Sequence, residues 1–174
     1  MSKAGPLSQS EGLSLLTQLL LGLQYLHSQN IIHRDIKLSN VFRSKEGLYK
    51  LGDFGVSKKI FEKDGLAETS VGTPFYLSPE VCRGEKYGFA TDVWGLGCAL
   101  FEAMTRDKPF GGKGGGFSEV VAEILSGKPD LDRLGGKGSL LASLIERMLR
   151  KKAEERPSVE TMLGLPEIVA KVRL

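Results

Sequence analysis

Residues 33–40 read HRDIKLSN, and this stretch decides how the rest of the chain is interpreted. Two further motifs follow it at defined distances. Residues 53–55 read DFG, and Asp53 lies 18 positions after Asp35 (53 − 35). Residues 78–80 read SPE, and Glu80 lies 27 positions after Asp53 (80 − 53). One such triplet is a weak signal, whereas three in this order indicate a single functional unit.

Length and composition restrict the class of protein. The 174 residues are 41% hydrophobic, enough to bury one sizeable core, and we expect one domain. The net charge of +3 (24 − 21) is small and scattered, which argues against nucleic-acid binding. Cys82 and Cys98 lack metal-site spacing, so we expect a reduced, intracellular protein with a buried Cys98 thiol. Residues 1–6 lack the apolar region of a secretory signal, and the Leu-rich residues 13–26 are too polar to span a membrane.

The first half of the chain predicts one helix followed by short strands. Ser8 and Glu11 have the spacing of a capping box, and leucines then recur at helical spacing as far as about Ser28. Asn30 is expected to end this helix in the left-handed conformation. Short strands are predicted for residues 31–32, 41–42 and 48–51.

The second half predicts several helices after a long polar loop at residues 57–78. Residues 92–104 are apolar almost all round, which places this helix at the centre of a domain. Residues 111–116 have the glycine-rich composition of a flexible linker. Amphipathic helices are predicted near 117–126 and 139–150, and a last one begins around Pro157 and Ser158.

The three motifs resemble the catalytic loop, the metal-binding loop and the end of the activation segment of a eukaryotic protein kinase. The phrases at 51–55, 72–80, 96–98 and 156–159 look most like the NIMA-related (NEK) serine/threonine branch. The resemblance covers about residues 8–170. It implies that residues 1–174 form a partial kinase domain, a mainly α C-terminal lobe with short β pairs around the catalytic loop.

The sequence contains no motifs of the N-terminal (upper) lobe of such a kinase. Only 32 residues precede His33, and they contain neither a Gly-rich loop nor a Val-Ala-Ile-Lys strand. The resemblance therefore implies that the N-terminal β-lobe, which clamps ATP, is absent. Without it one face of the nucleotide would be left in water, so we expect this chain alone to be inactive or weak.

The resemblance implies a phosphoryl-transfer site that uses ATP and Mg²⁺. Asp35 would orient the acceptor hydroxyl and accept its proton, and Lys37 would reach the transferred phosphate. Asn40 and Asp53 supply hard oxygen ligands that suit Mg²⁺. Phe42 matches the residue that packs beneath the adenine ring. Taken singly, Asp35 could cap a turn, Lys37 could face solvent and Asn40 could fill a turn.

Structural roles for five further residues are also implied. His33 and Phe54 match two residues that stack under the active site, and Asp92 matches the buried anchor of the central helix. Glu80 and Arg156 match the pair that ties the activation segment to the lower helices. The alternative for this pair is a surface contact that contributes little to stability.

The resemblance implies substrate and regulatory residues within the activation segment. Thr73 would hydrogen-bond near the catalytic loop and help to select Ser/Thr substrates. Thr69, four residues earlier, is the first candidate for an activating phosphorylation, and Ser70 is the second. Arg34 would pair with the added phosphate. The alternative is that Thr69 and Ser70 are ordinary solvated loop residues.

We therefore predict a kinase that phosphorylates Ser/Thr hydroxyls of protein substrates and has no nucleic-acid or membrane partners. We expect an intracellular, cytoplasmic setting, with the cytoskeleton or the nucleus as alternatives that the resemblance implies. One alternative is a non-catalytic lobe that only binds proteins. The intact Asp35, Lys37, Asn40 and Asp53 argue against it, because a binding module has no chemical need of them. An unrelated helical scaffold would have to match three motifs by chance.

Overall fold

The computed structural model describes residues 5–52, 74–111, 114, 116–135 and 138–172. Five residues of the predicted site, namely Asp53, Phe54, Thr69, Ser70 and Thr73, lie outside the described residues. The polar loop predicted at 57–78 also lies largely outside them.

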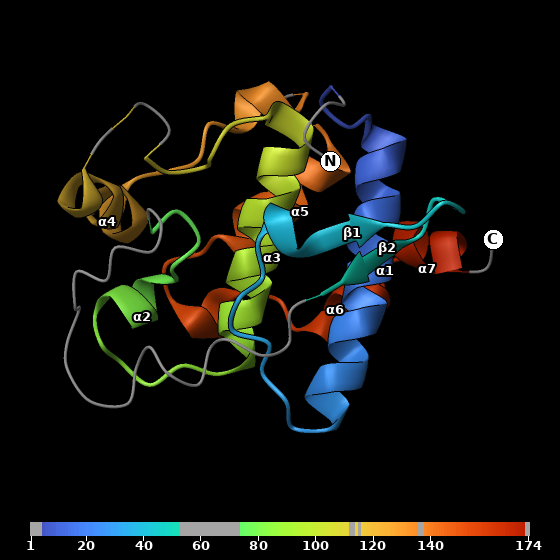
Figure 1. Cartoon of the computed structure of the whole chain (residues 1–174), viewed down its shortest axis with the longest axis horizontal. Helices are drawn as coiled ribbons and strands as arrows, with labels where there is room; N and C mark the ends of the chain where they lie inside the picture. Colours follow the sequence, from blue (N-terminus) through green and yellow to red (C-terminus); the bar gives the residue numbers. More distant parts are fainter. Residues whose placement is uncertain (1–4, 53–73, 112–113, 115, 136–137, 173–174) are drawn as a thin grey trace.

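The described chain is mainly helical, as predicted. Helices α1 (Gln9–Ser28) and α3 (Phe89–Thr105) pack against each other, and α5 (Leu140–Met148) packs on α3 (Figure 1). Helices α6 (Val159–Leu163) and α7 (Pro166–Val172) pack against α1. The core therefore lies around the two longest helices, and the shorter elements surround them.

Both ends of α1 have the features that the sequence predicted. The Ser8 side chain accepts a hydrogen bond from the Glu11 amide, and the Glu11 carboxylate accepts one from the Ser8 amide at 3.0 Å. The chain leaves the helix with Asn30 at φ 57°, in the left-handed region. Between these ends, five leucines are at most 1% exposed: Leu15, Leu16, Leu19, Leu20 and Leu23.

Helix α3 passes through the centre of the molecule, because it has no polar face. Trp94, Leu96 and Cys98 are fully buried, and the Trp94 ring stacks on Phe110 with centroids 5.4 Å apart. The helix begins three residues before the predicted apolar stretch (92 − 89). Cys98 is buried, as predicted, and its burial raises the pKa of the thiol to about 12.

A single two-stranded antiparallel sheet occurs in the described residues. Strand β1 (Val41–Arg43) pairs with β2 (Tyr49–Leu51), with Val41 opposite Leu51, and the hairpin packs on α1 (Figure 1). The predicted strand at residues 31–32 is wrong. The Ile31 amide instead donates to the Leu26 carbonyl at 2.9 Å, so this segment completes the end of α1.

The peripheral helices agree with the sequence to different degrees. Helix α4 (Phe117–Ser126) has the predicted bounds, and Ser139 caps α5 where a helix was expected to begin. The short helix α2 (Pro79–Cys82) was not predicted. The chain after Pro157 forms α6 and α7 rather than one helix.

Three short 3₁₀ turns complete the described elements: η1 (Leu38–Asn40), η3 (Leu131–Leu134) and η4 (Ala153–Glu155). The first glycine of the expected linker is fixed, because the Gly111 amide donates to the Glu123 carboxylate at 2.5 Å. Among the described residues, no helix has the length and apolar character needed to cross a membrane.

Candidate functional site

Three predicted site residues meet in the catalytic loop. The Lys37 Nζ lies 2.8 Å from Oδ2 of Asp35, and the Asn40 Nδ2 donates to the same oxygen at 2.9 Å. Asn40 Nδ2 also lies 2.9 Å from the main-chain oxygen of Asp35. The turn η1 makes this possible, because it folds Asn40 back over the loop. The Asp35 carboxylate is thus held by an ammonium and an amide.

The site combines fixed geometry with access. The side chains of Asp35 and Lys37 are 32% and 35% exposed, whereas Asn40 is buried at 7%. A ligand can therefore reach the Asp35 carboxylate from solvent, while the buried Asn40 side chain fixes the orientation of the carboxylate. A carboxylate in this state can orient a hydroxyl group and accept its proton.

The loop before Asp35 is anchored by Asp92 at the start of α3. Asp92 is 1% exposed, and its Oδ2 accepts from the His33 amide and pairs with His27 Nε2, both at 2.9 Å. Its Oδ1 accepts from the Arg34 amide at 2.9 Å. Arg34 has φ 69°, a left-handed conformation that is costly for a non-glycine residue, so these bonds hold a strained backbone in place. The predicted anchoring role of Asp92 agrees with this geometry.

The catalytic loop also lies directly against the backbone of α3. A Cβ atom at Gly95 would lie 2.9 Å from the main-chain oxygen of Ile36 and 3.1 Å from its Cβ. Only a residue without a side chain allows this approach. The position of the loop relative to the core is therefore set by contact as well as by the Asp92 hydrogen bonds.

Asn40 is the described residue best suited to hold a divalent cation. Its amide nitrogen is turned toward Asp35, which leaves Oδ1 without a hydrogen-bond partner among the described residues. An amide oxygen beside a carboxylate suits Mg²⁺, which prefers oxygen ligands. No cluster of three or more His, Cys, Asp or Glu side chains able to hold a metal occurs in the described part of the chain.

Phe42 forms an exposed aromatic surface beside this cluster. It lies on β1 and is 58% exposed. Its ring lies across Gly52, because a Cβ there would be 2.5 Å from the Phe42 Cε2 atom. Phe42 therefore presents an apolar face next to the loop that leads into Asp53.

A second polar network, centred on Tyr76, was missed by sequence reasoning. Its hydroxyl group accepts from the Leu38 amide at 3.3 Å and from Lys108 Nζ at 3.0 Å, and it donates to the Glu102 carboxylate. Lys108 Nζ lies 2.5 Å from Glu102 Oε1 and 4.6 Å from the Tyr76 ring centroid. The network ties the segment before α2 to the catalytic loop and to α3. Glu102 and Lys108 lie 26 and 32 positions from Tyr76 in the sequence, and no local motif connects them.

The predicted pair Glu80 and Arg156 is buried and bidentate. The two contacts measure 2.8 and 2.7 Å, and the side chains are 6% and 0% exposed respectively. Thr91 also donates to Glu80, and Arg156 also donates to the main-chain oxygen of Ala90. Burial would raise the pKa of the Glu80 carboxyl, but hydrogen bonds and charge from Arg156 lower it to about 2.

The proposed regulatory residues are only partly described. Arg34 is exposed, and its guanidinium lies 5.3 Å from the ring centroid of Tyr87. Thr69, Ser70 and Thr73 lie outside the described residues, so their distances from Arg34 and Asp35 are not defined.

Comparisons with known proteins identify the family. The family model for the protein kinase domain matches residues 1–166. Mouse serine/threonine-protein kinase Nek5 is 39% identical over 165 residues, covering 91% of this chain and 25% of that protein. Mouse serine/threonine-protein kinase Nek11 is 41% identical over 159 residues, covering 90% of this chain and 24% of that protein. The chain thus spans about a quarter of the length of these relatives.

A solved structure agrees with this assignment. Rad53 residues 1–466, crystallised in complex with AMP-PNP, superpose with a TM-score of 0.76 at 26% identity. The match covers 94% of this chain and 41% of that one. The chain belongs to the protein kinase family and to its Nek-like serine/threonine branch.

Proposed function

We propose that this chain is the C-terminal lobe of a serine/threonine protein kinase that transfers the γ-phosphate of ATP to Ser/Thr residues of intracellular protein substrates. The observation that carries the proposal is the Asp35 carboxylate, fixed by Lys37 and Asn40 yet one-third exposed. Phosphoryl transfer needs positioning and charge stabilisation more than covalent chemistry, and this cluster supplies both.

Each residue has a distinct role in this mechanism. Asp35 would orient the substrate hydroxyl and accept its proton, and Lys37 would contact the transferred phosphate. Asn40 and Asp53 would hold Mg²⁺, which supplies positive charge to the phosphate oxygens when bound. Phe42 would support the adenine ring from below, and Thr73 would contact the catalytic loop and favour Ser/Thr acceptors.

An N-terminal β-lobe is part of the proposed active enzyme. Asp35, Lys37 and the Phe42 ring are all open to solvent on the described chain. Electrostatic stabilisation of a transition state is strongest in a site that excludes water, so an upper lobe must cover these groups.

The experiment joins a Nek-type N-terminal lobe ahead of Ser8 and follows radiolabelled phosphate transfer to a generic protein substrate. The fusion should be active and residues 1–174 alone should not. Asp35→Asn in the fusion should lower kcat by about 10²–10⁴-fold, the usual contribution of a general base. Asp130→Asn, at an exposed position on another segment, is the matched control and should leave kcat unchanged.

Two results would overturn the proposal. A correctly folded fusion without activity would favour the alternative of a protein-binding lobe. Strong turnover by residues 1–174 alone, abolished by Asp35→Ala, would show that the upper lobe is dispensable.

The division of labour between the two aspartates has its own test. Asp53→Ala in the fusion should remove the Mg²⁺ dependence of nucleotide affinity. Asp35→Asn should leave nucleotide affinity nearly intact, because its role belongs to the transition state. Calorimetric titration of both variants distinguishes these outcomes, and an equal loss of affinity would contradict the assignment.

We also propose that phosphorylation of Thr69, or of Ser70, activates the kinase through Arg34. The support is the position of Arg34, whose amide is bonded to Asp92 and whose neighbour is Asp35. A phosphate group carries about −1.5 to −2 charges and pairs readily with arginine. Mass spectrometry after incubation with ATP should find phosphate at one of the two residues. Unchanged activity in the Thr69→Ala, Ser70→Ala double variant would rule the switch out.

A further inference from the structure

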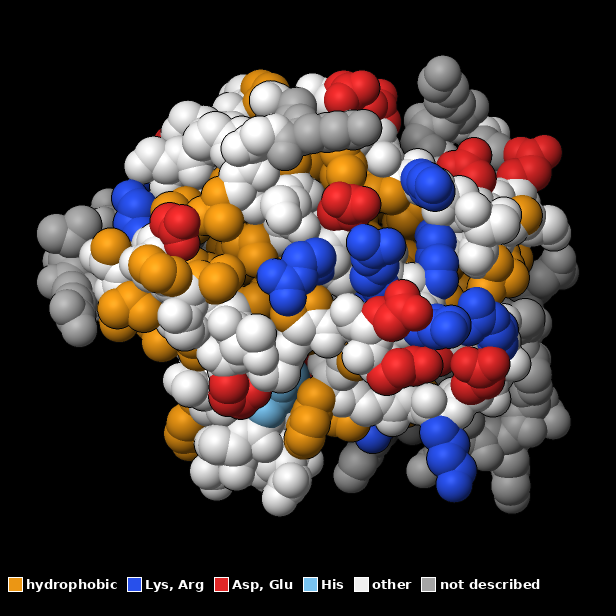
Figure 2. All heavy atoms as spheres, turned by 180° about the vertical axis from the view of Figure 1, so that it is seen from behind, with side chains coloured by type: hydrophobic (Ala, Val, Ile, Leu, Met, Phe, Trp, Pro, Cys, Tyr) orange, Lys and Arg blue, Asp and Glu red, His pale blue; other side chains and the backbone are white. Residues whose placement is uncertain are grey.

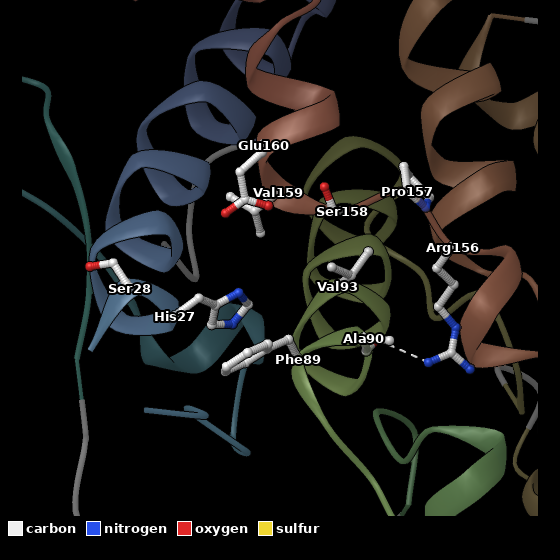
Figure 3. A pocket seen from close by; sticks show the side chains of 10 residues that line it. All are labelled: His27, Ser28, Phe89, Ala90, Val93, Arg156, Pro157, Ser158, Val159 and Glu160. Atoms are coloured by element: carbon white, nitrogen blue, oxygen red, sulfur yellow. Dashed lines mark hydrogen bonds between the residues drawn. The ribbon is translucent and has the colours of Figure 1, made fainter. Parts of the chain in front are cut away.

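A pocket of about 360 Å³ opens between the end of α1, the start of α3 and the start of α6. Figure 3 shows that His27 comes from α1, Phe89 and Val93 from α3, and Val159 and Glu160 from α6. None of these residues belongs to the phosphoryl-transfer cluster described above. The pocket is therefore a separate feature of the lobe.

Aromatic and aliphatic groups form the inside of this pocket. The rings of His27 and Phe89 stack with centroids 4.4 Å apart and an interplanar angle of 29°. Phe89 is nevertheless 41% exposed, so one side of the pair remains open to solvent. Val93 and Val159 are buried beside them. This lining favours a flat ligand that can stack on the exposed aromatic side.

The charge of the pocket favours a cation. Glu160 is exposed, and its carboxylate has no hydrogen bond or ion pair with any described residue. Figure 3 shows this carboxylate over the side where His27 lies. Arg156 also lines the pocket, but its guanidinium is occupied by Glu80 and by backbone carbonyls. The uncompensated charge at the rim is therefore negative. A guanidinium or amidinium group satisfies both conditions, because it stacks on aromatic rings and pairs with carboxylates.

One wall of the pocket is bonded to the anchor of the catalytic loop. His27 Nε2 lies 2.9 Å from Asp92 Oδ2, the same oxygen that accepts from the His33 amide at 2.9 Å. The other oxygen of Asp92 accepts from the Arg34 amide. A ligand stacked against this wall would restrict His27 and thereby the carboxylate that positions residues 33 and 34.

We propose that this pocket binds a planar cation, a guanidinium or amidinium group, and that the bound cation stiffens the catalytic loop through His27 and Asp92. Such a group is available as an arginine side chain of a peptide or as a small amidine. Binding of the cation and ordering of the catalytic loop do not depend on phosphoryl transfer by the chain.

The binding test uses residues 1–174 labelled with ¹⁵N, titrated separately with benzamidine and with a short blocked arginine peptide. Benzamide is the uncharged control for the first probe, and a citrulline peptide is the control for the second. The cationic probes should shift the amide signals of Ser28, Phe89 and Val159, and the neutral ones should not. Tighter binding of the peptide would identify arginine as the ligand, and binding of benzamidine alone would identify a small amidine.

Variants test the two contacts that the proposal requires. Glu160→Gln should weaken binding of the cationic probe by about two- to fivefold, as expected for the loss of one exposed charge contact. Glu167→Gln, an exposed glutamate on α7, is the matched control and should bind as the unmodified chain does. Phe89→Leu should also weaken binding, because it removes the stacking face but keeps an apolar side chain. Absence of binding by both cationic probes, or equal binding by Glu160→Gln, would overturn the site.

The coupling to the catalytic loop has an independent measurement. Hydrogen exchange of the His33 and Arg34 amides should slow several-fold when the pocket is saturated, because both amides donate to Asp92. His27→Phe keeps an aromatic ring in the wall and removes the bond to Asp92. This variant should still bind the probe but lose the exchange response. Unchanged exchange in the unmodified chain at saturation would overturn the coupling.

Discussion

Two groups of charged residues in this chain differ sharply in their exposure. The Glu80–Arg156 pair is at most 6% exposed, whereas Asp35 and Lys37 are about one-third exposed. The buried pair connects distant segments and has nearly all its hydrogen-bonding capacity satisfied within the protein. The exposed pair retains access to ligands. The comparison indicates that stability depends on other charged residues than those proposed to carry the chemistry.

Removal of one partner from the buried pair should have the largest effect on stability. Arg156→Met would leave the Glu80 carboxylate buried without its counter-charge, and we expect a loss of about 3–5 kcal/mol in the free energy of unfolding. The double variant with Glu80→Gln should recover a large part of that loss, since no buried charge remains. Urea denaturation followed by circular dichroism measures both. Equal instability of the single and double variants would show that packing dominates.

Acid should weaken the same pair. The pKa of Glu80 is about 2 in the folded chain and about 4.5 in the unfolded one. The contribution of the ionised Glu80 to the free energy of unfolding is therefore complete above about pH 4.5 and is lost as the pH falls toward 2. Linkage gives about 3 kcal/mol over this range. Urea denaturation at pH 7, 4 and 2.5 measures the loss of unfolding free energy on acidification. This loss should be larger in the unmodified chain than in the Glu80→Gln, Arg156→Met variant, which serves as the control for all other carboxyl groups.

Asp92 should have an intermediate effect, because two of its three partners are backbone amides of one loop. Asp92→Asn can accept fewer hydrogen bonds, and we expect a loss of about 1–3 kcal/mol. Amide exchange should be accelerated most at His33 and Arg34. If exchange rises equally throughout α3, Asp92 stabilises the core rather than the loop.

The exposed pair should have the smallest effect on folding. Lys37→Ala should change the free energy of unfolding by less than about 1 kcal/mol, as expected for an exposed ion pair. Urea denaturation provides the measurement. A loss as large as that of Arg156→Met would contradict the separation between the stabilising residues and those proposed to react.

Other charges at the surface also form exposed pairs that contribute little to stability. Figure 2 shows basic and acidic side chains interspersed on the rear face. Described surface pairs such as Arg133 with Asp107, and Lys152 with Glu155, are 41–69% exposed. Pairs of this kind contribute little to stability, so the buried contacts remain the better targets.

The sequence predicted the long elements well because their signals are local. The capping box at Ser8 and the run of leucines defined α1, and the apolar character of residues 92–104 identified the buried helix α3. Short elements carry too few residues for periodicity to appear. Helix α2 has four residues and was missed, and residues 31–32 were predicted as a strand because β-branched residues favour extended structure.

The candidate site was predictable only in part. Asp35, Lys37 and Asn40 lie within six consecutive positions, so a motif could bring them together, and the structure does so. The contacts of Tyr76 with Glu102 and Lys108 depend on tertiary packing, and no spacing in the sequence indicates them. The left-handed conformation of Arg34 was also unforeseen, because it depends on a hydrogen bond to Asp92, 58 positions away.

Gly95 limits the substitutions that the central helix α3 can accept. In an exposed helix, alanine would be favoured over glycine by about 1 kcal/mol. At this position a single methyl group would collide with the main chain of Ile36, the residue between Asp35 and Lys37. The substitution that most favours a helix would thus displace the residues proposed to carry the chemistry. A search for more stable variants would find a gain at Gly95 only by moving the catalytic loop.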